Sequence, residues 1–123
     1  MKKGPVTPKG FRDIGPELAK KRRTTIDKIA GVLEDFGFVP IETPTLEFSQ
    51  TLLGKYGEDE KLIYQFTDRG GRDVTIRPEM TPTVARMVAQ KRKELTFPLR
   101  WFSIPNLFRY ERPQRGRLRE HWQ

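Results

Sequence analysis

Apolar residues recur at three- and four-residue intervals from Pro16 to Phe36, a spacing that predicts one amphipathic helix. Pro16 suits the first helical position, where its missing N–H costs nothing, and Glu17 suits the positive end of the helix dipole. Gly37 can adopt positive φ and is expected to end the helix. The apolar stripe consists of Leu18, Ile26, Ile29, Ala30 and Leu33.

Shorter apolar runs separated by turn residues predict the strands. The first run, 38–44, contains two prolines, and because proline removes a ladder donor we expect an edge or interface strand there. Residues 68–72 contain two glycines and predict a hairpin turn. The predicted strands cover residues 38–44, 62–67, 73–77, 99–103, 107–112 and 118–123.

The segments between the strands predict the remaining elements. Residues 46–53 are expected to form a short helical turn and residues 54–61 a charged loop. Thr81 is expected to cap a second helix, with Pro82 at its first position and its end near Lys93. The order helix, strand, hairpin, helix, hairpin predicts an α+β fold with a mainly antiparallel sheet and flanking helices, not a doubly wound one.

Length and composition restrict the class of protein. The chain has 123 residues, which is one small domain or part of a larger one. It contains no apolar run near the ~18 residues that a membrane span needs. The absence of cysteine excludes disulfides and thiolate metal sites and fits a cytoplasmic protein.

The net charge of +8 is unevenly distributed along the chain. Residues 1–30 carry nine Lys or Arg against three Asp or Glu, residues 31–68 two against eight, and residues 69–123 thirteen against five. Basic regions favour polyanions such as nucleic acid or nucleotide phosphates as partners. A solvated, lysine-rich surface is the alternative, and charge alone leaves both open.

The terminal hairpin concentrates permanent positive charge. Arg109 and Glu111 lie two apart on one strand, and Arg117 and Arg119 two apart on the other, so each pair shares a face. Closing the hairpin could bring Arg109 and either Arg117 or Arg119 to a common anion, since guanidinium forks onto phosphate oxygens. A solvated ribbon of Arg/Glu pairs, each contributing about 0.2–1 kcal/mol, is the alternative.

Residues 75–81 place a carboxylate and a hydroxyl at a helix entrance. Glu79 and Thr81 could cap the helix, or they could face a cleft and accept from a substrate ammonium group. The lone His121 has neither triad partners at a suitable spacing nor a metal cluster beside it, which favours a structural or stacking role. Residues 56–60 are interpreted as a solvated acidic loop.

Together these segments resemble the class II aminoacyl-tRNA synthetases, and within them the histidyl-tRNA synthetase family. The resemblance covers nearly the whole chain, and the strings RPEMT and RYERPQRGR are its most specific parts. Residues 9–13 (KGFRD) resemble the N-terminal signature, residues 16–44 motif 1 with its dimer interface, residues 76–81 the amino-acid-binding segment and residues 99–123 motif 2, the ATP-binding hairpin.

The resemblance implies a role for each matching residue. Arg109 would hold the ATP α-phosphate and the substrate carboxylate, Glu111 the adenine edge, and Arg117 the distal phosphates. Glu79, Thr81 and Gln123 would bind the α-ammonium of histidine. His121 stands where many relatives have an adenine-stacking phenylalanine, and either it or the neighbouring tryptophan could take that role. The homodimer interface would include Phe38, Ile41 and Pro44.

The implied reaction is ATP-dependent activation of histidine followed by transfer to tRNA(His), with Mg²⁺ bound to the phosphates. Motif 3, the histidine-specific segment and the anticodon domain have no counterpart in the sequence, so we expect a truncated catalytic core with weak or partial activity. Two alternatives stay open: a synthetase-like regulatory subunit of ATP phosphoribosyltransferase, and a dimerising or RNA-binding fragment without catalysis.

Overall fold

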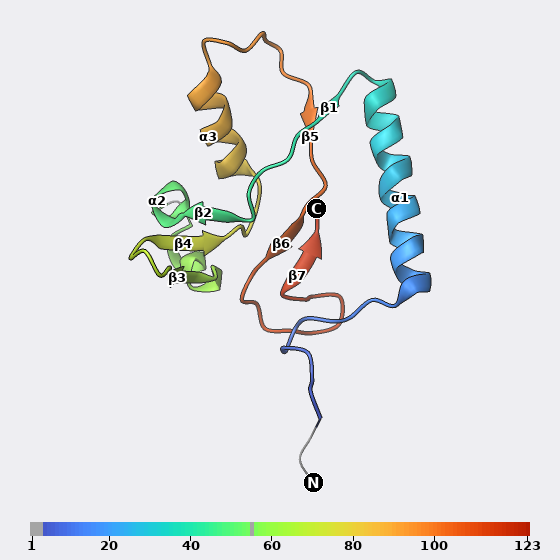
Figure 1. Ribbon diagram of the computed structural model, residues 1–123, viewed down its shortest axis with the longest axis vertical. Helices are drawn as coiled ribbons and strands as arrows, with labels where there is room; N and C mark the ends of the chain where they lie inside the picture. Colours follow the sequence, from blue (N-terminus) through green and yellow to red (C-terminus); the bar gives the residue numbers. More distant parts are fainter. Residues whose placement is uncertain (1–3, 55) are drawn as a thin grey trace.

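Eleven helices and strands lie in the computed structural model, which describes residues 4–54 and 56–123. Figure 1 shows the long helix α1 on one side, α3 with a small sheet on the other, and a terminal hairpin between them. The elements are α1 (Pro16–Asp35), β1 (Val39–Pro40), β2 (Leu46–Phe48), α2 (Ser49–Leu52), the 3-10 helix η1 (Gly57–Leu62), β3 (Gln65–Thr67), β4 (Asp73–Ile76), α3 (Thr81–Lys91), β5 (Trp101–Phe102), β6 (Asn106–Phe108) and β7 (Glu120–Trp122).

Three small sheets confirm the predicted α+β class with mainly antiparallel pairing. Strands β2, β4 and β3 form an antiparallel sheet in that order, and β6 pairs antiparallel with β7. The short strand β1 pairs in parallel with β5, which is the one parallel pair among the described strands. Proline at the end of β1 is consistent with this edge position.

Three predictions about local structure are wrong. Residues 46–48 form a strand, because they pair with residues 74–76, and only Ser49–Leu52 is helical. Thr81 does not cap α3: Met80 occupies the cap, no side chain bonds there, and Pro82 follows Thr81 inside the first turn. Residues 57–62, expected as a loop, form the 3-10 helix η1.

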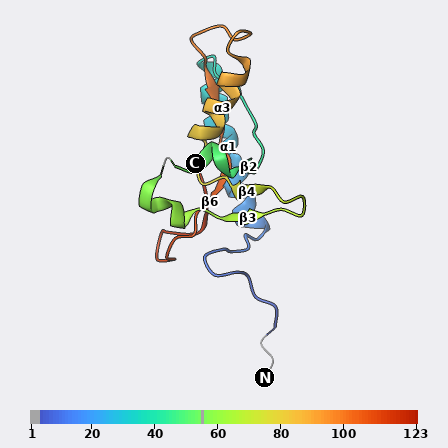
Figure 2. The same ribbon diagram turned by 90° about the vertical axis from the view of Figure 1, so that its left-hand side faces the viewer.

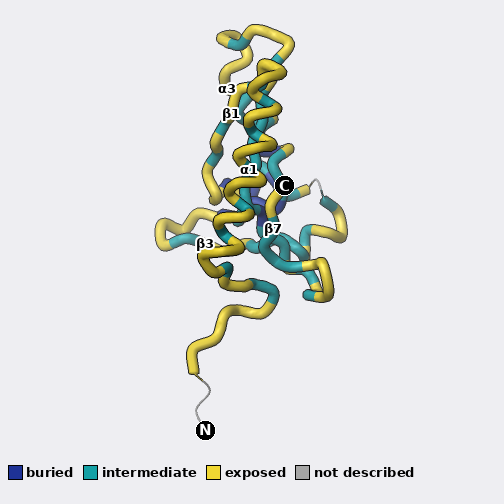
Figure 3. The backbone as a smooth tube through the Cα atoms, turned by 90° about the vertical axis from the view of Figure 1, so that its right-hand side faces the viewer, coloured by how far each residue is buried: buried dark blue, intermediate teal, exposed yellow. Residues whose placement is uncertain are grey.

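The hydrophobic core is small and lies away from α1. Its buried apolar residues are Leu52, Val74 and Leu107. Helix α1 has no buried residue, and Figure 3 shows it exposed along most of its length. Ile29 and Val32 on this helix are 49% and 57% exposed. The described part of the chain therefore leaves an apolar helix face uncovered.

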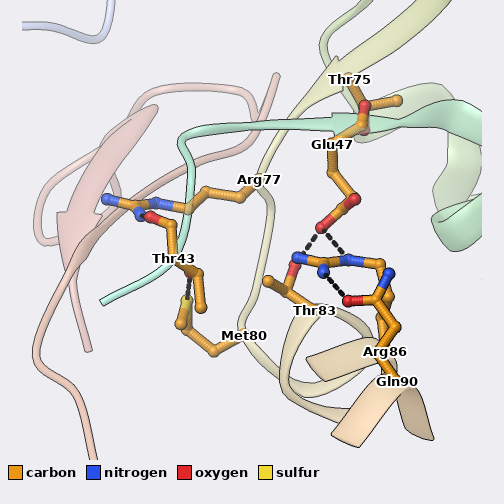
Figure 4. A network of polar contacts seen from close by, with 8 residues as sticks. All are labelled: Thr43, Glu47, Thr75, Arg77, Met80, Thr83, Arg86 and Gln90. Atoms are coloured by element: carbon orange, nitrogen blue, oxygen red, sulfur yellow. Dashed lines mark hydrogen bonds and ion pairs between the residues drawn. The ribbon is translucent and has the colours of Figure 1, made fainter. Parts of the chain in front are cut away.

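A buried ion pair holds α3 against β2 (Figure 4). The side chain of Glu47 is 6% exposed, and its Oε2 accepts from Arg86 Nε over 3.0 Å and from the Thr83 hydroxyl over 3.2 Å. Arg86 Nη1 also donates to Gln90 one turn further along α3. A charge with this little exposure requires such partners. The contact fixes the helix whose first residue is Thr81.

The segment before α1 runs away from the other elements, as Figure 2 shows. Where it passes the hairpin, Arg119 N donates to Gly10 O over 2.9 Å. Among the helices that the structure describes, none is long and apolar enough to cross a membrane.

Candidate functional site

The terminal hairpin lies against the segment that carries Glu79. The amide of Phe108 donates to Arg77 O over 3.0 Å, and Arg109 Nε donates to Pro78 O over the same distance. Within the described residues, Nη1 and Nη2 of Arg109 have no hydrogen-bond partner. The structure therefore brings together the two segments in which the sequence predicted a site, and it leaves two donors of Arg109 available there.

Arg77 fixes the base of this arrangement. It is 8% exposed, and its guanidinium donates to Thr43 O, to Asn106 O and to Asn106 Oδ1 over 2.8–3.0 Å. Figure 4 shows the side chain extending toward the chain that enters β2. Burial lowers the pKa of Arg77. Three segments that are distant in the sequence are thus joined through one planar cation.

Glu79 is engaged by a tyrosine from outside the expected site. The Tyr56 hydroxyl donates to Glu79 Oε1 over 2.5 Å. Burial, and next the Glu79 carboxylate, raise the pKa of the Tyr56 phenol, whereas Arg109 opposes the shift. The phenol is therefore protonated at neutral pH. The interpretation of residues 56–60 as a solvated loop is wrong for Tyr56, which is half-buried, although Glu58 and Asp59 are exposed.

Thr81 lies at the first position of α3 and is exposed. Pro82 and Thr83, which follow it, are both buried. The hydroxyl of Thr81 makes no side-chain cap bond. It is thus exposed at the helix entrance, two residues after Glu79.

Glu111 and Arg117 form an ion pair across the hairpin, with side chains 13% and 58% exposed. A backbone bridge between Gln114 and Arg117 closes the turn next to them. In this conformation the two side chains pair with each other, and Arg117 is the more exposed of the two. Such a contact is weak enough to exchange.

Arg119 does not join Arg109 at a common anion. Its Nε donates to Glu111 O over 2.9 Å, and its guanidinium carbon lies 3.9 Å from the centre of the Tyr110 ring. Nη1 donates to Lys9 O over 3.2 Å. The side chain therefore anchors the N-terminal segment to the hairpin. Of the two arginines that the sequence left open, this excludes Arg119 from the shared-anion arrangement.

Strand β7 presents two aromatic residues on opposite faces. His121 pairs with Leu107, and Trp122 pairs with Asn106 on the other face. Arg22 of α1 stacks over the Trp122 ring at 3.8 Å. Gln123 is exposed after the strand, and its backbone N–H donates to Pro105 O over 3.2 Å. The Trp122 ring is thus in contact with Arg22 of α1, whereas His121 is half-buried on the other face of the strand.

A cavity of about 920 Å³ lies between the start of α1 and the hairpin. It does not include Glu79 or Arg109, so it is separate from the meeting point of the two predicted segments. Its charged and aromatic lining residues include Arg12, Lys21, Arg22, Arg115, His121 and Trp122. In residues 4–54 and 56–123, no group of three His, Cys, Asp or Glu side chains could hold a metal ion.

The expected dimer residues lie next to the β1–β5 pair. Phe38 and Ile41 are half-buried, and Ile41 N donates to Phe102 O over 2.9 Å. Pro44 is exposed. Phe38 N donates to Leu33 O over 3.0 Å, so the residue before β1 is bonded to the end of α1.

Sequence reasoning missed the roles of Tyr56 and Arg77. The spacing of 23 residues between Tyr56 and Glu79 carries no local signal. Arg77, by contrast, sits directly between a strand and a proline, and an arginine at the end of a buried strand could have indicated a structural cation.

The family model and the curated relatives that match this chain name the same enzyme. The family model described as histidyl-tRNA synthetase matches residues 10–123. A histidine–tRNA ligase of Leptospira biflexa serovar Patoc is 51% identical over 117 residues, which cover 94% of this chain and 27% of that protein. The chain therefore spans about a quarter of the length of the curated relatives it matches.

Two solved structures share the fold at 29% sequence identity. Histidyl-tRNA synthetase from Nostoc sp. PCC 7120 superposes with a TM-score of 0.80 over 95% of this chain and 26% of its own. An ATP phosphoribosyltransferase regulatory subunit/histidyl-tRNA synthetase from Bacillus halodurans C gives 0.78 over 95% and 30%.

Proposed function

The chain belongs to the histidyl-tRNA synthetase family, and from this membership we propose that it carries part of a class II catalytic core that activates histidine with ATP. The parts are motif 1 at about 16–44, an amino-acid-binding segment at 76–81 and motif 2 at about 99–123. In the whole protein the histidyl group then passes to tRNA(His). Charging of tRNA implies the cytoplasm as its location.

One observation carries the proposal: the bond from Arg109 Nε to Pro78 O. It sets a permanently charged, planar donor beside the backbone that leads into Glu79. Activation requires the histidine carboxylate to attack the α-phosphorus of ATP, with pyrophosphate leaving. A cation at that point neutralises both reacting anions, and because its Nε is fixed, the terminal nitrogens need little reorganisation.

The remaining roles follow from position. Glu79 and Thr81 at the entrance of α3, with Gln123 after β7, would bind the α-ammonium of histidine. Glu111 would accept from the adenine edge, and Arg117 would turn from Glu111 to the distal phosphates. We assign adenine stacking to His121, because Arg22 already covers the Trp122 ring.

Mg²⁺ would arrive on the nucleotide. The described residues offer no acidic cluster for a resident ion, which fits a metal bound mainly by phosphate oxygens. Bound there, the ion would neutralise the charge of the departing pyrophosphate.

A homodimer is part of the proposal. The uncovered face includes Leu18, Ile29 and Val32 of α1 and Phe36 directly after it, each about half exposed or more. An apolar face of this kind is stable in water when a second surface covers it. The segment with Phe38, Ile41 and Pro44 follows α1, and Phe38 N donates to Leu33 O at the end of that helix, which supports motif 1 as the contact between two copies.

Histidine-dependent exchange of pyrophosphate into ATP tests the activity. We expect a measurable histidine-dependent rate in the chain and its loss in Arg109→Ala. A matched control is Arg112→Ala, an exposed arginine of the same hairpin that has no assigned role. If the exchange rate of the parent chain does not exceed that of Arg109→Ala, the proposal is wrong.

The regulatory subunit of ATP phosphoribosyltransferase is the second candidate, because the Bacillus halodurans structure carries both descriptions. A regulatory role predicts histidine binding without exchange of pyrophosphate. The presence of Arg109, Glu111 and Arg117 at the motif 2 positions favours the synthetase.

A further inference from the structure

Tyr56 lies outside every segment that resembles the family motifs, yet its hydroxyl bonds to Glu79. We propose that Tyr56 is a positioning residue for the substrate amine: it holds Oε1 of Glu79 and so directs Oε2 to the ammonium group. This inference rests on the proposed function, because it takes Glu79 as the residue that binds the amine.

The loop that carries Tyr56 is anchored on both sides of the site. Asp59 N donates to Tyr56 O over 3.1 Å, which starts η1. At the other end of η1, Leu62 O accepts from Tyr110 N of the motif 2 hairpin over 2.7 Å. The Tyr56 ring is therefore held relative to the hairpin that contains Arg109 as well as to Glu79.

The chemistry of the contact favours orientation of Glu79. A phenol that donates to an ionised carboxylate forms a strong, charge-assisted bond. Within the described residues, Oε2 of Glu79 has no partner. A glutamate side chain otherwise samples many rotamers, and fixing it in advance lowers the entropy that binding must overcome. Burial keeps the Tyr56 phenol protonated, so it remains a donor when the amine arrives.

The opposite role for this hydroxyl would be competition, in which Tyr56 occupies the place of the amine until a ligand displaces it. The two roles predict opposite signs for Tyr56→Phe, which keeps the ring and removes only the donor. Tyr64→Phe is the matched control, because Tyr64 packs against Phe11 and Tyr110 and its hydroxyl bonds to no described residue.

Calorimetric titration of the full chain with L-histidine and, separately, with ATP measures the effect. Tyr56→Phe should weaken histidine binding by about threefold to tenfold, the value of one net hydrogen bond. The Kd for ATP should not change, and Tyr64→Phe should change neither. In a Glu79→Ala background, which removes the acceptor, Tyr56→Phe should have no further effect on histidine binding.

Unchanged or tighter histidine binding in Tyr56→Phe overturns the inference, and so does an equal loss of ATP affinity, which would indicate a general structural effect. If the parent chain binds histidine in that experiment, the proposed function is not contradicted even though the role of Tyr56 is. A chain that binds ATP but no histidine overturns the amino-acid site of the proposed function, and the role of Tyr56 with it.

Discussion

Replacing Arg86 with methionine removes the cation that faces the buried carboxylate of Glu47. Loss of one partner of a buried pair costs about 3–5 kcal/mol, because the other charge is left uncompensated. Here the Arg86 side chain is 28% exposed, and Glu47 keeps the Thr83 hydroxyl as a donor. Water can therefore reach part of the site, and we expect a loss of about 2–3 kcal/mol in the free energy of unfolding.

Urea unfolding of four proteins measures this: the parent chain, Arg86→Met, Glu47→Gln and the double variant. Glu47→Gln keeps an acceptor for Thr83 and should cost about 1–2 kcal/mol. Both single changes remove the same ion pair, so the double variant should cost less than their sum by at least about 1 kcal/mol.

The control is Lys21→Met, which removes an exposed ion pair on α1. The side chains of Lys21 and Glu17 are 70% and 87% exposed, so the change should cost less than about 0.5 kcal/mol. If Arg86→Met costs no more than Lys21→Met, or if the single effects add, the buried pair does not hold α3.

Three further changes test other parts of the structure. Gly10→Ala should lower the melting temperature, because Gly10 has φ +87° and a Cβ there would lie 2.7 Å from Arg119 side-chain atoms. The pKa of Asp68 is lowered, chiefly by the backbone N–H of Arg72, so its stabilisation of the β3–β4 turn exists above the usual pKa of 3.8 and is lost as pH falls through the lowered value. Asp68→Asn should therefore flatten the dependence of the unfolding midpoint on pH below about 4, in urea titrations at several pH values. Val32→Asp should convert the proposed dimer to a monomer in sedimentation experiments, and an unchanged mass would contradict the assignment of the α1 face.

Helix α1 shows what local signals can predict. The sequence placed its start at Pro16 and its end before Gly37, and the structure has Pro16–Asp35 with Gly37 at φ +80°. Both ends depend on residues whose backbone preferences act within one turn. The same holds for the β3–β4 hairpin, whose turn is fixed by Asp68 accepting from Gly70 N and Arg72 N.

Strand β2 shows what local signals cannot predict. Its residues Leu46 and Phe48 pair with Ile76 and Val74, so a strand forms where the sequence favoured a helical turn. The carboxylate of Glu47 in the middle of this strand is compensated by an arginine 39 residues away. Pairing over such distances depends on the assembled fold, and tertiary contacts override local preference.

The candidate site shows both what the sequence can predict and what it cannot. Residue types and motif order predicted that Arg109 and Glu79 share one site, and the bond from Arg109 to Pro78 brings their segments together. The sequence could not separate Arg117 from Arg119, since both were predicted to lie on one face of a strand that in the structure begins only at Glu120. The two arginines differ in their partners, because Arg119 donates to Lys9 O of the N-terminal segment.

Residues 77–81 are bonded to three segments that are distant in the sequence. Arg77 binds the segments before β2 and in β6, Pro78 accepts from the hairpin, Glu79 accepts from Tyr56, and Met80 accepts from Thr43 over 3.7 Å. Thr81 then begins the helix held by the buried ion pair. The contacts come from three other segments, around Thr43, around Tyr56 and in 106–109, so the position of Glu79 depends on all of them. A substitution such as Arg77→Lys, which keeps the charge and loses the planar fork, should therefore weaken histidine binding even though it touches no ligand.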